Sequence, residues 1–198
     1  MPAPSLRSRT TVFLDRDGTI NLRPADGEYI TSPAGLALLP GAARAVAELN
    51  AAGLRTVLVT NQRWLSGPSG DPACYAAIHA HLEQLLAAEG ASLSAAYHCP
   101  HAIGACDCRK PQPGMLRRAA REHRFELGEA VIVGDSDCDL LAGRAAGTST
   151  ILLRPPSREG PASGHADAIA SDLPAAVRLI LQANLAAARG KTLYRRPG

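Results

Sequence analysis

The 198-residue chain carries 21 basic and 18 acidic residues, a formal net charge of +3, and 46% hydrophobic residues. Its length and composition fit one globular domain with a core, and its basic residues are too scattered to indicate a nucleic-acid partner. No apolar run reaches the roughly 18 residues that a membrane span needs, and the first residues lack the apolar core of a signal peptide. We therefore expect a cytoplasmic protein without nucleic-acid or membrane partners. We expect a monomer, because the sequence shows no obvious apolar stripe of the kind that joins two subunits.

The first predicted strand carries two acidic residues at its end. Residues 1–10 are expected to be a flexible lead-in, and the β-branched and aromatic run 11–14 predicts a buried strand. Asp15 follows directly, and Asp17 precedes a turn. Open α/β sheets place their chemistry at such strand ends. One carboxylate can attack as a nucleophile and the other can transfer a proton, while two close carboxylates favour a divalent cation. The alternative is a plain acidic turn.

The next segment, 21–40, is a polar loop rich in proline and glycine. It is too short and too interrupted to hold a helical cap domain, so we expect an open substrate site. Tyr29 is a candidate for packing on a ligand, and a partly buried loop anchor is the alternative. A helix is predicted over 41–50.

The second strand, predicted over 54–60, ends in polar groups. The hydroxyl of Thr60 and the amide of Asn61 are candidates to hold phosphate oxygens; a polar strand-end cap is the alternative. A loop at 62–68 contains the only tryptophan, and a helix is expected over 71–89, with Asp as N-cap and proline in first position.

A third strand, predicted over 93–97, leads into a loop, 99–108, with three cysteines and one histidine. Three thiolates and one imidazole match a structural tetrahedral Zn²⁺ site, which would stabilise a loop too short to build a core. Five cysteines are an odd number, which favours metal or free thiols in the cytosol. The alternatives are free cysteines or a Cys99–Cys106 disulfide. The predicted ligands are Cys99, His101, Cys106 and Cys108.

Two cations follow this loop directly, at the start of a helix predicted over 111–124. A metal beside them would fix the direction of Arg109 and Lys110. Lys110 can neutralise a nucleophile and its phosphate, and Arg109 can fork onto a second phosphate or a sugar oxygen. The alternative is two solvated bases.

The fourth strand, predicted over 130–134, ends at Asp135, a candidate metal ligand. Asp139 is either an outer acid of that site or the N-cap of the next helix. The alternation of strands and helices predicts an α/β fold with a doubly wound parallel sheet, in one domain over 11–188 before a flexible tail, 189–198. The remaining elements are expected at 140–146, 148–153, 168–169 and 174–188.

This order of strand-end motifs, over about residues 11–185, resembles the haloacid-dehalogenase-like (HAD) phosphatases. The motifs 15–21, 60–62, 99–101 and 106–116 are similar to those of the D-glycero-D-manno-heptose-1,7-bisphosphate phosphatases. Their near relatives, the histidinol-phosphate phosphatases, share the zinc loop.

The resemblance implies a Mg²⁺-dependent enzyme in which Asp15 attacks phosphorus and Asp17 is the acid/base. It places Mg²⁺ on Asp15, the carbonyl of Asp17 and Asp135, and phosphoryl contacts on Thr60 and Lys110. The resemblance further implies that the four ligands in the 99–108 loop bind Zn²⁺ with a structural role. The predicted substrate-binding residues are Tyr29, Asn61, Gln62, Arg63 and Arg109.

The chain departs from the family pattern near the substrate. Arg63-Trp64-Leu65 replaces the usual Ser-Gly-Ile, Ser136 replaces a frequent lysine, and the zinc loop is short. The favoured hypothesis is removal of the 7-phosphate of the heptose bisphosphate, with Arg109 and Arg63 on the second phosphate. Histidinol phosphate and other small sugar phosphates are alternatives, although histidinol suits an arginine-lined pocket poorly. A non-catalytic zinc-stabilised module would leave the strand-end motifs unexplained, and a phosphomutase would need a cap.

Overall fold

The computed structural model describes residues 9–25, 27–156 and 163–193. Its centre is a six-stranded sheet in the order β3-β2-β1-β4-β5-β6, in which every neighbouring pair is parallel. The predicted parallel α/β sheet is confirmed. The strands are β1 (Thr11–Leu14), β2 (Arg55–Asn61), β3 (Ala95–Cys99), β4 (Ala130–Gly134), β5 (Ser149–Leu153) and β6 (Ala168–Ala170).

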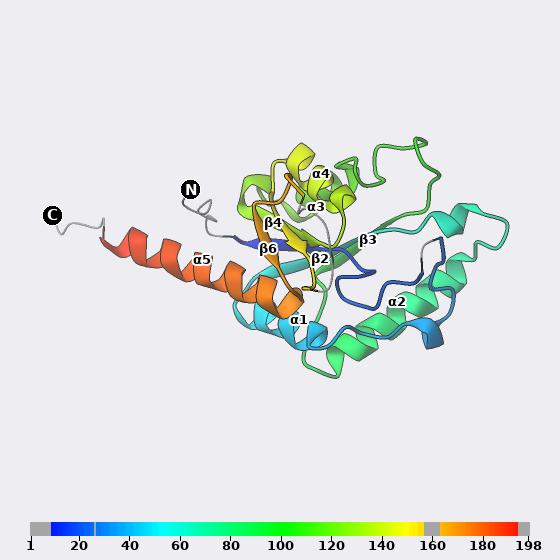
Figure 1. Cartoon of the computed structure of the whole chain (residues 1–198), viewed down its shortest axis with the longest axis horizontal. Coiled ribbons are helices and arrows are strands. Elements are labelled where there is room, and N and C mark those ends of the chain that lie inside the picture. Colours follow the sequence, from blue (N-terminus) through cyan, green and yellow to red (C-terminus); the bar gives the residue numbers. More distant parts are fainter. Residues whose placement is uncertain (1–8, 26, 157–162, 194–198) are drawn as a thin grey trace.

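Helices cover both faces of the sheet (Figure 1). Along β1, Val12 and Leu14 enter the core on one face, while Phe13 enters the core on the other. The first core includes α1, α2 and α5, and the second includes α3 and α4. The helices are α1 (Ala42–Ala51), α2 (Pro72–Ala87), α3 (Gly114–His123), α4 (Asp137–Ala146) and α5 (Leu173–Leu193), with short 3-10 turns η1 (Pro33–Gly35), η2 (Arg63–Ser66) and η3 (Leu127–Glu129).

The strand order places a topological switch between β1 and β4. From β1 the chain builds outward through β2 to β3, whereas β4, on the other side of β1, leads to β5 and β6. Connections leave the two central strands in opposite directions, which opens a crevice at their carboxyl ends. Both central strands are buried along their whole length.

Several predicted boundaries need correction. The third strand lies at Ala95–Cys99 and not at 93–97, because its register with β2 pairs Val57 with Ala95 and Asn61 with Cys99. The helix expected over 111–124 begins at Gly114 and ends where Arg124 adopts a left-handed conformation, with φ of 52°.

The termini also differ from expectation. Arg9 lies within the predicted lead-in, yet its side chain is buried and donates to the carbonyl of Gly128 at 2.7 Å. The last helix continues through residues that we assigned to the tail, as far as Leu193. Residues 1–8 and 194–198 lie outside the described part of the chain.

Between β1 and α1, the described residues form η1 and isolated bridges, in agreement with the predicted lack of a helical cap. Among the described helices, none combines the length and apolarity that a membrane span would need.

Candidate active site

A pocket of about 330 Å³ opens at the carboxyl ends of the central strands. Most of the predicted site residues line it, although they come from segments far apart in the sequence. The structure therefore brings together Asp15, Asp17, Tyr29, Thr60, Asn61, Arg63, Arg109 and Lys110, along with Arg23, Ser136, Cys138 and Asp139.

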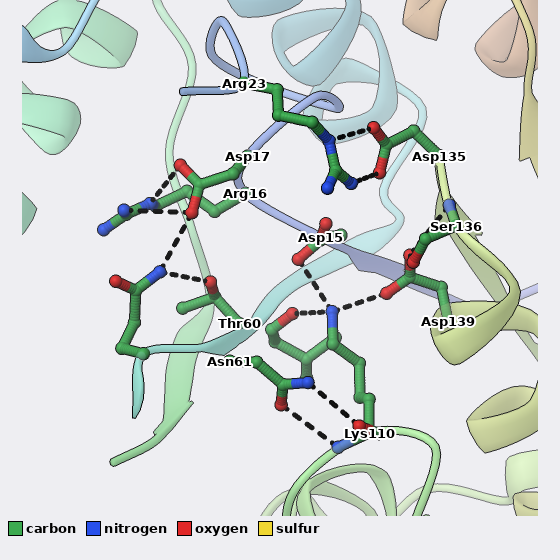
Figure 2. Close-up of polar contacts among 12 residues, drawn as sticks. Asp15, Arg16, Asp17, Arg23, Thr60, Asn61, Lys110, Asp135, Ser136 and Asp139 are labelled. Atoms are coloured by element: carbon green, nitrogen blue, oxygen red, sulfur yellow. Dashed lines mark hydrogen bonds and ion pairs between the residues drawn. The ribbon is translucent and has the colours of Figure 1, made fainter. Parts of the chain in front are cut away.

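Lys110 lies at the centre of this site, and its side chain is only 3% exposed. Its ammonium donates to Asp15 Oδ1 at 2.7 Å and to Asp139 Oδ1 at 2.5 Å (Figure 2). It also donates to the carbonyl of Val59 at 2.8 Å, so all three N–H groups have acceptors. Burial opposes the charged form, but the carboxylates of Asp139 and Asp15 outweigh it and raise the pKa of Lys110.

Asp139 is fully buried and accepts hydrogen bonds from two residues, Ser136 and Lys110. Its Oδ2 accepts from the backbone N–H of Ser136 at 3.2 Å and from the Ser136 hydroxyl at 2.6 Å. Ser136, not Asp139, is the N-cap of α4, and the two form a capping box. The N-cap alternative for Asp139 is therefore wrong, and its other oxygen is directed at Lys110.

The carboxylates of Asp15, Asp135 and Asp139 form a compact acidic cluster, with oxygens within 4.8 Å of one another. Burial, followed by repulsion from Asp139, raises the pKa of Asp15 to about 7, against the opposing effect of Lys110. Burial also raises the pKa of Asp135. Three carboxylates face two cations, Lys110 and Arg23, so one negative charge is unmatched among these groups. This donor set fits a divalent cation that prefers oxygen ligands.

Asp17 is held by four hydrogen bonds from three side chains. Arg16, itself buried, donates from Nε to Oδ1 and from Nη2 to Oδ2, both at 3.1 Å. Asn21 donates to Oδ1 at 2.9 Å, and Gln62 donates to Oδ2 at 3.0 Å. The carboxylate thus has a defined orientation at the edge of the pocket that it lines.

Two glycines of the sequence motifs make room for the acids. Gly18 has φ of +89°, and a Cβ there would lie 2.0 Å from Asp135 Oδ2. A Cβ on Gly134 would lie 2.3 Å from Asp139 Cγ. Any side chain at either position would therefore displace a carboxylate of the acidic cluster, and Gly18 also needs the left-handed backbone that glycine tolerates.

Asn61 and Gln62 both make hydrogen bonds to other residues of the site. The Asn61 amide donates to the carbonyl of Lys110 at 2.9 Å and accepts from its N–H at 3.1 Å, so it holds the Lys110 backbone. Gln62 is fully buried and does not line the pocket. Its amide is directed at Asp17 and Thr60, and a contact of Gln62 with substrate stays a prediction.

Arg23 is a site residue that the sequence did not reveal. Its guanidinium donates from Nε to Asp135 Oδ2 at 2.8 Å and from Nη2 to Asp135 Oδ1. This hydrogen bonding to Asp135 raises the pKa of Arg23. The two residues are far apart in the sequence, and an arginine in a polar loop carries no signal for such a pairing.

The four predicted zinc ligands converge on one point. The sulfurs of Cys99, Cys106 and Cys108 lie 3.2 to 3.5 Å apart, and His101 Nδ1 lies 3.2 Å from Cys108 Sγ. Tetrahedral Zn–S bonds of about 2.3 Å would place ligand sulfurs about 3.7 Å apart, close to this spacing. All three cysteines are free, which contradicts the disulfide alternative.

Arg109 connects the cysteine cluster to the pocket. Its backbone N–H donates to Cys106 Sγ at 3.3 Å, and its side chain lines the pocket. The Arg109 Nη1 atom is buried, and no described residue accepts a hydrogen bond from it. A buried N–H of a guanidinium without an acceptor is costly, so this atom is suited to an anionic ligand.

Comparison with known proteins gives concordant results. A model of the HAD-hydrolase-like family matches residues 107–176. The D-glycero-beta-D-manno-heptose-1,7-bisphosphate 7-phosphatase of Pseudomonas aeruginosa is 38% identical over 148 residues, covering 74% of this chain and 82% of that protein. The D-glycero-D-manno-heptose-1,7-bisphosphate 7-phosphatase of Thermosynechococcus vestitus is 39% identical, covering 87% of this chain and 95% of that protein.

Solved structures show the same likeness. The D,D-heptose 1,7-bisphosphate phosphatase from B. bronchiseptica, in complex with magnesium and phosphate, superposes with a TM-score of 0.79. The two chains are 35% identical, and the match covers 87% of this chain and 98% of that one.

Proposed function

We propose, from the premise that this chain belongs to the family of the D-glycero-D-manno-heptose-1,7-bisphosphate 7-phosphatases within the HAD-like hydrolases, that it removes the 7-phosphate of that bisphosphate. One observation carries the proposal. At the switch between β1 and β4, Lys110 joins Asp15 to Asp139 beside a pocket that Asp17 and Thr60 also line.

Magnesium is the cation that we assign to the acidic cluster, since the B. bronchiseptica relative holds magnesium and phosphate. Asp15, Asp135 and the backbone carbonyl of Asp17 would hold it in this chain. When bound, Mg²⁺ would offset the negative charge of the carboxylates and of the phosphoryl oxygens. Both Asp135 oxygens accept hydrogen bonds from Arg23, so Arg23 and the cation would compete for the charge of this carboxylate.

The chemistry proposed for the side chains has two steps. In the first, a carboxylate oxygen of Asp15 attacks phosphorus, the bond to the leaving oxygen breaks, and Asp17 donates a proton to that oxygen. In the second, Asp17 takes a proton from water, the water oxygen attacks the aspartyl-phosphate, and inorganic phosphate leaves. Lys110 and Thr60 stabilise charge on the phosphoryl oxygens, which is the main source of catalysis in phosphoryl transfer.

The pocket favours a substrate with a second phosphate. Arg23, Arg63 and Arg109 all line it, and guanidinium groups suit phosphate oxygens because they donate two parallel hydrogen bonds. The buried Nη1 of Arg109, which has no acceptor among the residues that the structure describes, is the group that we assign to the second phosphate. Histidinol phosphate would bring an amine toward these arginines, which disfavours it. One chain supplies the proposed nucleophile, the acid/base and the phosphate-binding side chains, and we propose that a monomer is sufficient for activity.

Zinc is the metal that we propose for Cys99, His101, Cys106 and Cys108. Its role is structural, because four protein ligands leave no open position for substrate. The hydrogen bond from the Arg109 N–H to Cys106 Sγ would fix the backbone at Arg109 and thereby help to position the side chains of Arg109 and Lys110.

A substrate panel tests the proposal. Purified enzyme with Mg²⁺ is given both anomers of the heptose 1,7-bisphosphate, histidinol phosphate and p-nitrophenyl phosphate, and phosphate release is measured. We expect the highest kcat/KM for one bisphosphate anomer, and we expect Asp15→Asn to abolish turnover without changing the circular dichroism spectrum. Equal activity of Asp15→Asn would refute the mechanism. Preference for histidinol phosphate would refute the substrate, and a lack of turnover on every compound would favour a binding module.

A further inference from the structure

We propose that Trp64 is a positioning residue that acts through Gln62 to orient both Asp17 and Thr60. The inference rests on the proposed phosphatase mechanism and adds to it a residue that touches neither substrate nor metal. Trp64 stands two residues after Gln62, in the loop that follows β2, and it is the only tryptophan of the chain.

A continuous set of hydrogen bonds links the indole to the site. Trp64 Nε1 donates to Gln62 Oε1 at 2.9 Å. Gln62 Nε2 donates to Asp17 Oδ2 at 3.0 Å and to Thr60 Oγ1 at 2.8 Å. Gln62 is fully buried, so these contacts replace water for its whole amide group.

The direction of each bond follows from the chemistry of the groups. An indole N–H can only donate, so it requires the oxygen of the Gln62 amide to face Trp64. The amide nitrogen must then face the opposite way, toward Asp17 and Thr60. Without the indole, the buried Gln62 oxygen would lose the hydrogen bond from Trp64, and the acceptors Asp17 and Thr60 alone would hold the amide in this orientation.

The orientation of Thr60 follows from the same arrangement. Because Gln62 donates to Thr60 Oγ1, the hydroxyl proton of Thr60 does not point at Gln62. Thr60 is almost fully buried yet contributes to the pocket lining, so its proton is available to a phosphoryl oxygen there. The Gln62 amide therefore orients both the acid/base, Asp17, and the phosphoryl-binding hydroxyl of Thr60.

Packing holds the indole in place. Trp64 lies in η2 and packs, partly buried, against the core cluster that contains Leu14, Leu58 and Ile78. An aromatic ring that is anchored by packing, with its single polar atom bonded, loses little further freedom when it holds a partner. Trp64 is thus suited to fix Gln62 before substrate binds.

The test separates the two steps of the reaction with p-nitrophenyl phosphate. Its leaving group departs without a proton, so formation of the aspartyl-phosphate does not need Asp17, whereas hydrolysis of the aspartyl-phosphate does. Trp64→Phe keeps an aromatic ring and removes the indole N–H. Gln62→Leu removes the relay, which is the set of hydrogen bonds from Trp64 through the Gln62 amide to Asp17 and Thr60. Ser66→Ala is the matched control, because the Ser66 hydroxyl donates within the same η2 turn to the Arg63 carbonyl and not to Trp64 or Gln62.

We expect kcat to fall about 100-fold in Gln62→Leu, at the lower end of the roughly 10²–10⁴ that general acid–base catalysis supplies. In Trp64→Phe we expect a smaller fall, of about 10-fold, because the Gln62 amide itself remains. Rapid mixing should show a burst of p-nitrophenolate in both variants and in Asp17→Asn, because aspartyl-phosphate accumulates. Ser66→Ala should stay within about twofold of wild type, and Trp64→Phe should add nothing to Gln62→Leu, as expected for residues in one network.

Wild-type kcat in Trp64→Phe, or a change in KM without a burst, would overturn the inference. If thermal melting shows that Trp64→Phe is unfolded, Gln62→Leu gives the same test with the indole in place. Failure of the wild type to turn over any phosphate ester would reject the proposed function. A burst in Asp17→Asn without one in Trp64→Phe or Gln62→Leu would reject only the role of Trp64.

Discussion

Lys110 Nζ lies 2.5 Å from Asp139 Oδ1, and the side chains of both residues are at most 3% exposed. This ion pair joins the loop after the cysteine cluster to the first turn of α4. Asp15 accepts a second hydrogen bond from the same ammonium, so the candidate nucleophile is oriented by a group whose own position depends on α4.

Replacement of Lys110 by methionine should impair both stability and turnover. It leaves Asp15 and Asp139 buried without their cation, and the loss of one partner from a buried pair costs about 3–5 kcal/mol. Urea denaturation measures the free energy of unfolding. The double variant Lys110→Met/Asp139→Leu should regain part of that stability but not the activity. Full activity in either variant would contradict the assigned role.

Replacement of Arg23 by glutamine should tighten Mg²⁺ binding, because Arg23 competes for both oxygens of Asp135. Its side chain is 47% exposed, and exposed ion pairs contribute only about 0.2–1 kcal/mol, so we expect a gain of about two- to fivefold. Isothermal titration calorimetry with MgCl₂ measures the affinity directly. Arg44→Gln is the control, since it removes an exposed pair with Glu48 outside the pocket. Weaker binding in Arg23→Gln would show that Arg23 supports the metal.

Disruption of the cysteine cluster should release zinc and disturb the site indirectly. Cys106→Ser removes a ligand and the sulfur that accepts from the Arg109 N–H. We expect zinc content, measured by mass spectrometry of the purified protein, to fall together with the melting temperature and kcat. Cys74→Ser is the matched control, because Cys74 lies outside the cluster and contacts the Thr31 carbonyl. Unchanged stability after zinc loss would reject a structural role.

Asn184 should matter for stability and not for catalysis. Its amide accepts from the Arg9 N–H at 2.6 Å and donates to the Arg9 carbonyl at 2.8 Å, which attaches the start of the described chain to α5. Asn184→Ala leaves both backbone groups without this partner, at about 1–3 kcal/mol. Thermal denaturation should show the loss while kcat stays at the wild-type value. Gln182→Ala, at an exposed position on the same helix, should have little effect.

Features that depend on residues close together in the chain could be predicted from the amino-acid order. Buried parallel strands appear as continuous apolar runs, so Asp15 and Asp135 could be placed at strand ends before the fold was known. The spacing from Cys99 to Cys108 places the cysteine and histidine ligands within one short loop, and they converge as predicted.

The pairs of side chains that meet across the crevice depend on how the folded strands and loops are arranged in space. The contacts of Lys110 with Asp139 and of Arg23 with Asp135 join distant segments, and no local pattern specifies them. The role of Gln62 could not be predicted from the sequence either, because a glutamine can contact substrate or can lie buried and link other side chains by hydrogen bonds. Its burial follows from how η2 packs Trp64 against the core, and that packing energy is shared over many residues rather than encoded in one motif.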